Sequence, residues 1–358
     1  MTGHDVTGPE ANGHGDRRRG RRSAALRAVG LALAGALVLG AAAAGWAYRH
    51  LNDNITGVDI DNALGDDRPA RAVTTPAPSG TASATPLPTG AVNILVLGSD
   101  SRSGARNQEL GGGDSEGARS DTAMVVHIDA GRTGATVVSI PRDTLVTRPS
   151  CPLPSGGTTA VAYGAMFNTA YAVGGPVCAV KTVESMTNVR MDHFVEVDFS
   201  GFARLVDALG GVTVTTEEDI DDEDSRLHLA AGTHHLDGTR ALALARTRHG
   251  IGDGSDLGRI GLQQTLVKAL LEQISSTDLL TSPTRLYQVA DAVTGGLTTD
   301  TGLDSLAELM ELGRSLKDLS ARNVTTVTLP VVTAPSDPNR VVAREPAASD
   351  LWESLNRG

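Results

Sequence analysis

The hydrophobic positions of this chain fall into one long uncharged run near the N-terminus and a later series of short runs. Residues 28–48 are 21 consecutive uncharged positions, mostly Ala, Leu, Gly and Val. A run of that length is sufficient to cross the apolar core of a bilayer as a helix. From residue 91 onward the apolar runs are short and are bounded by Gly, Pro, Asp or Ser, which is typical of a globular body. The pattern predicts a membrane helix followed by a folded body.

The first three short runs predict three strands whose ends carry charged side chains. VNILVLGSD (92–100) is mostly apolar and ends in Asp100, RSDTAMVVHID (119–129) opens with Arg119 and Asp121, and ATVVSIPRDT (135–144) reaches a proline followed by Arg142. The intervening AGRTG predicts a hairpin between the second and third strands. Binding sites in α/β proteins gather at strand ends, so these residues are candidates for a site.

Helices and further strands are expected between these runs and the C-terminus. Residues 158–188 have a helical apolar period with a break at the Gly-Gly-Pro of 174–176, and HFVEVDF (193–199) alternates as a strand. A short amphipathic helix, a VTVT strand, an acidic exposed loop at 219–224 and a late strand in VTTVTLPVV (324–332) follow. Strands mixed with helices without regular alternation predict an α/β (α+β) fold, with a mixed central sheet flanked by helices in a single domain.

One stretch, residues 241–274, concentrates side chains that suit an anion. It places Arg246 and Arg248 two residues apart, crosses a Gly/Asp/Ser loop, and continues into a helical pattern with Asp256, Arg259 and Gln263 on one stripe. Guanidinium groups match phosphate oxygens bidentately, and a helix N-terminus attracts negative charge. From the residues alone, a solvated helix start with ordinary surface ion pairs is the equal alternative.

Charge divides the chain into a basic N-terminus and an acidic remainder. The formal net charge is -11, yet six arginines crowd residues 17–27. Because basic residues precede the apolar run, the positive-inside rule predicts a cytoplasmic N-terminus and an extracellular body. Small residues near the end of the run also suit a cleavable signal peptide, although the run is longer than the usual core of such a peptide. An acidic, aromatic-poor, exported body argues against nucleic-acid binding.

These features predict five segments: a disordered Arg-rich cytoplasmic tail at 1–27, a transmembrane helix at 28–48, a Pro/Thr/Ala-rich linker at 49–90, a folded domain at 91–345 and a C-terminal tail at 346–358. Cys151 and Cys178 are the only cysteines. In an exported chain they predict a disulfide. Two cysteines without histidines at ligand spacing are too few for zinc.

Six blocks, in this order, resemble the LytR-CpsA-Psr family of cell-wall enzymes. They are NILVLGSDSR, RSDTAMVVHID, VVSIPRDT, FNTAYAVGG, HFVEVDFSGFARLVDALGGV and LDGTRALALARTRHG with the following SDLGRIGLQQ, and they fall within residues 91–333. The resemblance implies a membrane-anchored phosphotransferase. Such an enzyme moves a glycopolymer, as its sugar phosphate, from a polyprenyl diphosphate carrier to a hydroxyl of peptidoglycan. It also implies an apolar tunnel for the lipid between sheet and helices, and a pyrophosphatase side activity is a further expectation.

The resemblance also assigns residue roles. Asp100 and Asp121 match the carboxylates that organise Mg²⁺, with Mn²⁺ as the alternative ion. The residues implied to bind the diphosphate are Arg119, Arg142, Arg246, Arg248, Arg259 and Gln263. The residues expected to be catalytic are Asp121, Arg259, Asp256 and Arg142. Asp121 and Asp256 both remain candidates for the base that accepts the proton of the attacking hydroxyl.

The chain departs from the family pattern at Leu262, where many members carry a further arginine. Head-group binding is therefore expected to depend more on the other arginines. The alternative function is a non-catalytic protein that binds polyprenyl phosphate or wall polymer in the same pocket. Carboxylates beside an anionic diphosphate favour the enzyme, because a binder needs them only when a cation comes with the ligand. DNA-binding regulation is disfavoured, because the body is exported and acidic.

Overall fold

The computed structural model describes residues 38–71, 90–99, 120–153, 155–248, 256–276 and 282–357. The chain separates into two compact units, Met1–His50 and Leu51–Gly358. Residues 38–50 of the first unit are helical. Within the described ranges, no helix has both the length and the apolar character needed to span a membrane. The predicted tail at 1–27 and part of the predicted membrane helix, residues 28–37, lie outside the described residues, so both stay predictions.

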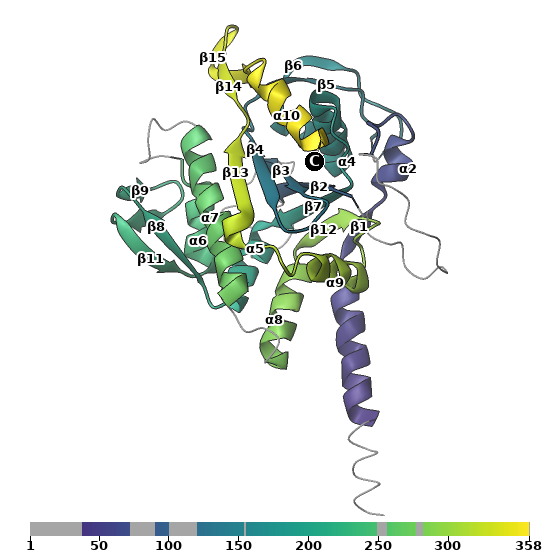
Figure 1. The fold of residues 1–358 in the computed structure, drawn as a ribbon, viewed down its shortest axis with the longest axis vertical. Helices are drawn as coiled ribbons and strands as arrows, with labels where there is room; N and C mark the ends of the chain where they lie inside the picture. The colour runs from purple at the N-terminus through teal and green to yellow at the C-terminus, as the bar shows by residue number, and fades with distance from the viewer. Residues whose placement is uncertain are drawn as a thin grey trace, which may run out of the picture. The chain divides into compact units, whose positions relative to one another are not determined.

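The second unit contains a seven-stranded mixed sheet (Figure 1). Its strands are, in spatial order, β1 (Thr56–Val58), β12 (Leu297–Asp300), β7 (His193–Asp198), β2 (Val92–Ser99), β3 (Ser120–Ile128), β4 (Ala135–Ile140) and β13 (Val324–Thr328). Strands β2, β3 and β4 are antiparallel neighbours, whereas β7 is parallel to β2 and β13 is parallel to β4. The predicted hairpin and the predicted mixed sheet flanked by helices are both confirmed.

Alternating residues of the central strands build two apolar clusters, one on each face of the sheet. On one face, Leu95, Leu97 and Phe194 pack with helices α2 (Ile60–Leu64), α4 (Asn168–Thr187) and α10 (Ala347–Arg357). On the opposite face, Ile94 and Met124 pack with helices α7 (Asp256–Ser276) and α9 (Leu306–Ser315). The period-two alternation of a strand explains why adjacent residues enter different clusters.

A third apolar cluster joins α7 to a smaller group of elements. These elements are α5 (Phe199–Ala208), α6 (Gly238–Arg246), the pair β8 (Val212–Thr216) and β11 (Gly232–Leu236), and the pair β9 (Ile220–Asp222) and β10 (Leu227–Leu229). The remaining elements are β5 (Leu145–Arg148), β6 (Ala162–Met166), α8 (Pro283–Thr294), η2 (Ala321–Asn323), β14 (Val331–Ala334) and β15 (Asp337–Ala343). Helix α7 thus touches both the sheet and this smaller group.

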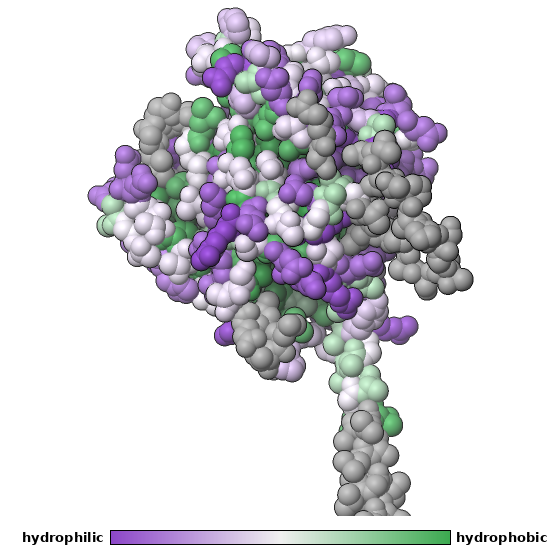
Figure 2. Space-filling model, viewed as in Figure 1, coloured by the Kyte–Doolittle hydropathy of each residue, from purple (hydrophilic) through white to green (hydrophobic). Residues whose placement is uncertain are grey.

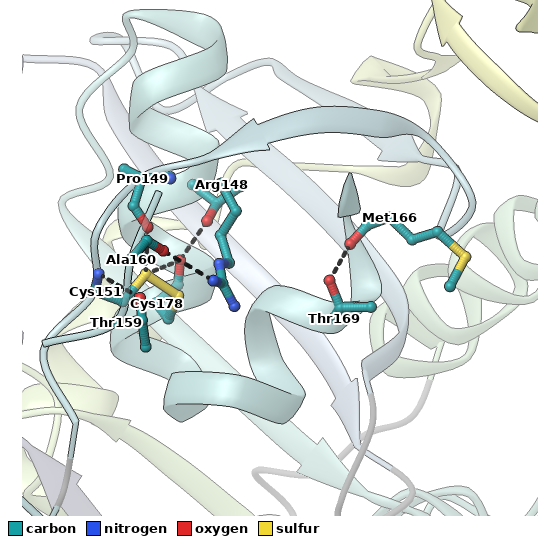
Figure 3. The surroundings of a disulfide bond; sticks show 9 residues. Arg148, Pro149, Cys151, Thr159, Ala160, Met166, Thr169 and Cys178 are labelled. Carbon is teal, nitrogen blue, oxygen red and sulfur yellow. Dashed lines mark hydrogen bonds between the residues drawn. A yellow bond between two sulfur atoms is a disulfide. The ribbon is translucent and has the colours of Figure 1, made fainter. Parts of the chain in front are cut away.

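The predicted disulfide joins Cys151, which follows β5, to Cys178 in α4 (Figure 3). Both cysteines are fully buried. Helix α4 is kinked where Gly174 and Gly175 leave helical backbone angles, as the Gly-Gly-Pro sequence predicts. A Cβ on Gly174 would lie 2.7 Å from the Cβ of Cys178, so a larger residue would collide with the disulfide. The glycine therefore allows the helix to approach the bridge.

Both predicted boundaries of the folded domain differ from the structure. In the segment predicted as linker, residues 51–71 belong to the body: β1 extends the sheet, and Ile60 and Leu64 enter a core cluster. The predicted C-terminal tail forms α10, which buries Trp352 and Leu355 in the same cluster. In each case a short amphipathic segment is stabilised by tertiary packing, which local composition does not reveal.

The predicted helix over 158–188 also begins later than expected. Residues 162–166 form strand β6, which pairs with β5, and the helix starts at Asn168. The alternating small and apolar residues of this stretch suit both periods, and pairing with a neighbouring strand decides the outcome.

Candidate functional site

The sheet brings the charged ends of β3 and β4 to one edge. These strands are antiparallel with Ala123 opposite Ile140, so continuing the register by two residues places Asp121 opposite Arg142. Arg142 Nη1 donates to Asp121 Oδ1 at 2.8 Å. Strand β2 ends at the same edge, because Ser99 pairs with β3 at its first residue. The next residue after Ser99 is Asp100, and this residue and Arg119 lie outside the described residues.

Two further arginines reach Asp121 from α6 and α7. Arg248, just beyond α6, donates from Nη2 to Asp121 Oδ2 at 3.2 Å. Arg259, in the first turn of α7, donates from Nη2 to the main-chain oxygen of Asp121 at 2.8 Å. The side chain of Arg259 is only 3% exposed. Both oxygens of the Asp121 carboxylate are therefore bound by guanidinium groups that come from distant parts of the chain.

Asp256 joins the start of α7 to the loop after β4. Its Oδ1 lies 2.5 Å from Arg259 Nη2 and 3.6 Å from Arg142 Nε, and its Oδ2 accepts the main-chain N–H of Arg142 at 3.2 Å. A carboxylate in the first turn of a helix is also favoured by the helix dipole. Asp143 adds a second acidic neighbour, 3.5 Å from Arg142 Nε. Arg142 is thus surrounded by three carboxylates.

Two more of the predicted site residues, Gln263 and Arg246, make contacts of other kinds. The amide nitrogen of Gln263 donates to Thr122 Oγ1 at 2.9 Å and to the Ala245 carbonyl at 3.0 Å, so this residue ties α7 to β3 and α6. The guanidinium of Arg246 lies over the ring of Phe199, 5.0 Å from its centre. The structure therefore brings together Asp121, Arg142, Arg248, Asp256 and Arg259, with Gln263 beneath them.

The arrangement shifts three pKa values. Burial favours the neutral form of Asp121, but the hydrogen bond and charge of Arg142, with the charges of Arg248 and Arg259, outweigh burial and hold the pKa of Asp121 below its usual value. Burial also opposes the charge of Arg142, yet the hydrogen bond and charge of Asp121 outweigh it and raise the pKa of Arg142. At Arg259 burial prevails and lowers the pKa to about 10. All three groups are charged at neutral pH.

The chemistry of the donor set suits a hard divalent cation. Within the part of the chain that the structure describes, each oxygen of Asp121 accepts one guanidinium bond, whereas a carboxylate oxygen offers about two acceptor positions. The Asp121 side chain is 29% exposed, so a ligand can reach it. Mg²⁺ binds proteins through one or two carboxylates while keeping waters or substrate phosphates. Asp121 therefore fits the ligand role that the resemblance implies.

Next to the charged strand ends, the face of the sheet that packs against α7 carries partly exposed apolar side chains. Val96 on β2, Val126 on β3 and Val195 on β7 point to the α7 side, and all three are partly exposed although their strands lie inside the sheet. Leu95 and Val125 on the opposite face have no exposure. Hydrophobic atoms are visible among hydrophilic ones in the space-filling view (Figure 2). We call Val96, Val126 and Val195 the apolar strip.

Comparison with known proteins adds an independent finding. The LytR_cpsA_psr family model matches residues 47–357. This chain belongs to the LytR-CpsA-Psr family. The match includes β1, α2 and α10, in agreement with the structural finding that these elements are part of the body.

Among LytR-CpsA-Psr relatives, the chain is 34% identical over 269 residues to the cell wall biosynthesis protein LcpA of Corynebacterium glutamicum, and the match covers 68% of this chain and 50% of LcpA. It is 32% identical to the polyisoprenyl-teichoic acid–peptidoglycan teichoic acid transferase TagU of Oceanobacillus iheyensis, over 62% of each chain. The chain thus spans only part of these relatives. Its fold matches a LytR-Csp2A-Psr enzyme from Actinomyces oris with a TM-score of 0.57, at 26% identity, over 81% of this chain and 96% of that one.

Sequence patterns do not predict the contacts of Asp143 and Thr122 or the burial of Asp222 in this LytR-CpsA-Psr chain. Asp143 pairs with Arg142 and with Arg340. Thr122 holds Gln263, and the signal for this contact is a polar residue on a strand position that otherwise faces apolar neighbours. The predicted exposed loop at 219–224 is wrong over residues 220–222, which form β9, and both Ile220 and Asp222 are buried. Alternation between Ile220 and Asp222 was the available signal.

Proposed function

We propose that this protein is a phosphotransferase that moves a glycopolymer from a polyprenyl diphosphate carrier to a peptidoglycan hydroxyl. The observation that carries the proposal is Asp121 bound by Arg142 and Arg248, with Arg259 behind it, at the strand edge where the apolar strip begins. A charged group beside an apolar strip suits a lipid diphosphate, because the head group and the tail need opposite environments. The relatives named as cell-wall biosynthesis proteins and teichoic acid transferases support the same class of reaction.

The reaction would proceed by attack of the acceptor hydroxyl oxygen on the phosphorus next to the sugar. A new oxygen–phosphorus bond forms, and the bond from that phosphorus to the bridging oxygen breaks, so polyprenyl phosphate leaves. The hydroxyl proton passes to a base or to the leaving phosphate. Charge grows on the phosphoryl oxygens and on the leaving group, so positioned cations are the main requirement.

The arginines would hold the diphosphate in line with the acceptor. Arg142 and Arg248 are 22% and 37% exposed, so their guanidinium groups can exchange part of their contact with Asp121 for phosphate oxygens. Arg259 is buried behind Asp121 and would contribute a positive charge at a fixed position. When bound at Asp121, and at Asp100 if that residue joins it, Mg²⁺ or Mn²⁺ would neutralise the diphosphate oxygens. The lowered pKa of Asp121 makes it a weak base, so a ligand role suits Asp121 better than proton abstraction.

The apolar strip would receive the polyprenyl chain. Burial of apolar surface contributes about 0.8 kcal/mol for each CH₂ group, so even a few isoprene units contribute substantially to binding. The helix at 38–50 exposes Val38, Leu39 and Trp46, which suits the end of a membrane anchor. We place the N-terminus in the cytoplasm and the body outside, so that the site would face the lipid carrier and the wall.

The test is a transfer assay on the full-length protein in detergent, with a synthetic polyprenyl diphosphate-linked sugar donor and peptidoglycan oligomers. Wild type should form product with Mg²⁺ and lose it with EDTA. Asp121→Asn and Arg259→Ala should lower kcat/KM by at least about 100-fold, whereas Arg240→Ala, an exposed position on α6, should not. Tight donor binding without transfer or hydrolysis under any condition would favour the alternative, a non-catalytic binding protein.

A further inference from the structure

The hairpin of β9 and β10 buries a carboxylate where a strand pattern would place an apolar residue. Leu227 pairs with Asp222, and Leu229 pairs with Ile220. Ile220, Leu227 and Leu229 all lie in the cluster between this hairpin, α6 and α7. Asp222 points the same way as Ile220 and is 1% exposed, whereas its neighbour Asp221 is exposed. A buried carboxylate is unfavourable unless hydrogen bonds satisfy it, so its partners indicate its role.

From the described residues, Asp222 accepts three main-chain N–H groups. Its Oδ1 accepts from Asp224 at 3.0 Å and from Ser225 at 3.3 Å, which closes the turn of the hairpin. Its Oδ2 accepts the N–H of Arg248 at 2.8 Å. The hydroxyls of Ser225 and Thr247 lie 2.9 Å apart and form a second link between the same segments. Two of the bonds are local, and the third reaches across to the chain just after α6.

The hydrogen bond from the Arg248 N–H to Asp222 fixes the main chain from which the Arg248 side chain extends. Helix α6 ends at Arg246, and Thr247 turns the backbone out of the helix. The Arg248 side chain is 37% exposed, so packing alone does not fix this long, flexible group. Its main chain is held by Asp222 at one end, and its guanidinium is held by Asp121 at the other. A shift of the main chain would carry the guanidinium away from Asp121.

We propose that Asp222 is a positioning residue, which acts through Arg248 and touches neither the diphosphate nor the acceptor. The proposal rests on the proposed function, because it assigns Arg248 a place at the diphosphate. A carboxylate is required at this position because it only accepts hydrogen bonds. An Asn side chain of the same size presents an NH₂ group to one set of N–H donors, so Asp222→Asn must break either the turn bonds or the bond to Arg248.

The test is a double-mutant cycle on the full-length protein in the transfer assay. The variants are Asp222→Asn, Arg248→Ala, the double variant, and Asp221→Asn as the matched control. Asp222→Asn should lower kcat/KM by up to about 100-fold, and the control should not. In the Arg248→Ala background, Asp222→Asn should lower kcat/KM by less than about a further twofold. The effect of Asp222→Asn on Tm should be the same in both backgrounds. The proposal is overturned if Asp222→Asn lowers kcat/KM by the same factor with Arg248 present and with Arg248→Ala, or if Asp222→Asn has wild-type activity.

A second measurement separates this inference from the proposed function. Hydrogen–deuterium exchange of the Arg248 amide, read from peptides that end at this residue, needs no substrate. Exchange should be slow in wild type and at least about tenfold faster in Asp222→Asn, with peptides of α7 unchanged. Unchanged exchange at Arg248 refutes the positioning role. A wild-type protein that neither binds nor transfers the donor refutes the proposed function, and the exchange result still decides the role of Asp222.

Discussion

Residues 51–71 are held to the body by a buried ion pair between Arg68 and Glu184, and loss of this pair should lower stability by a predictable amount. Arg68 donates from Nε and Nη2 to Glu184 in α4, at 2.7 to 3.1 Å, and from Nη2 to the Met191 carbonyl at 2.7 Å. The two side chains are 1% and 3% exposed. Glu184 also accepts the N–H of Met191 at 2.9 Å. Arg68 therefore fixes residues 51–71 against the body.

Replacing Arg68 by Ala removes the guanidinium that is bound directly to the buried Glu184 carboxylate, which then faces the N–H of Met191 and the charge of Arg190. Removal of one partner from such a pair costs about 3–5 kcal/mol, mainly because the remaining charge is not compensated. With a urea m value near 3 kcal/mol/M, this corresponds to a midpoint shift of about 1 to 2 M. The double variant Arg68→Met with Glu184→Met removes both charges and should lose less free energy of unfolding than Arg68→Ala alone.

Urea unfolding followed by tryptophan fluorescence measures this effect. The chain has two tryptophans, and Trp352 is buried in the cluster that contains Ile60 of α2. A Trp46→Phe background makes Trp352 the reporter. Arg71→Ala is the matched control, because its side chain is 54% exposed and its partner Asp192, although only 7% exposed, also accepts the N–H of Asn93 and so keeps a hydrogen bond when Arg71 is lost. Equal midpoints for Arg68→Ala and the control would refute the reasoning, and so would a double variant less stable than the single one.

Three further predictions follow from the fold. Burial raises the pKa of Glu196, although a hydrogen bond from Tyr171 acts in the opposite direction. The folded state therefore holds this proton more tightly than the unfolded state, and stability falls as pH rises from about 4.5 through the raised pKa. Glu196→Gln should gain Tm relative to wild type between about pH 4 and pH 7. Replacing Cys151 and Cys178 by Ser should cost about 3–4 kcal/mol in urea unfolding, from the loop that the disulfide closes. Val96→Phe should raise KM for a long-chain donor about tenfold, by displacing roughly two CH₂ groups, and leave a short-chain donor unaffected.

The central sheet could be predicted because its information is local. Strands β2, β3 and β4 are short apolar runs separated by clear turn residues, and their order follows from the hairpin. Once that order is known, antiparallel register places Asp121 beside Arg142. The contact of Arg259 with Asp121 could not be derived in this way, since it joins residues 138 positions apart. Only the family resemblance suggested it.

The elements that sequence patterns missed depend on distant partners. Strand β1 has three residues and is stabilised by pairing with β12, far along the chain. Helix α10 has a good apolar face, but its length is marginal for an isolated helix, so packing of Trp352 decides its existence. Asp222 lies in an acidic stretch whose composition predicts exposure, and the N–H groups of Asp224, Ser225 and the distant Arg248 make its burial possible. Local composition could not indicate any of these contacts.

The most direct test of the central claim is the identity and amount of the lipid product released during transfer. With a polyprenyl diphosphate-linked sugar donor, Mg²⁺ and peptidoglycan oligomers, mass spectrometry should find one polyprenyl phosphate for each phosphodiester formed on the acceptor. Both products should be lost together in Asp121→Asn. Release of polyprenyl diphosphate with sugar attached to the acceptor without phosphate would mean that a carbon–oxygen bond is broken, and this result would contradict a phosphotransferase.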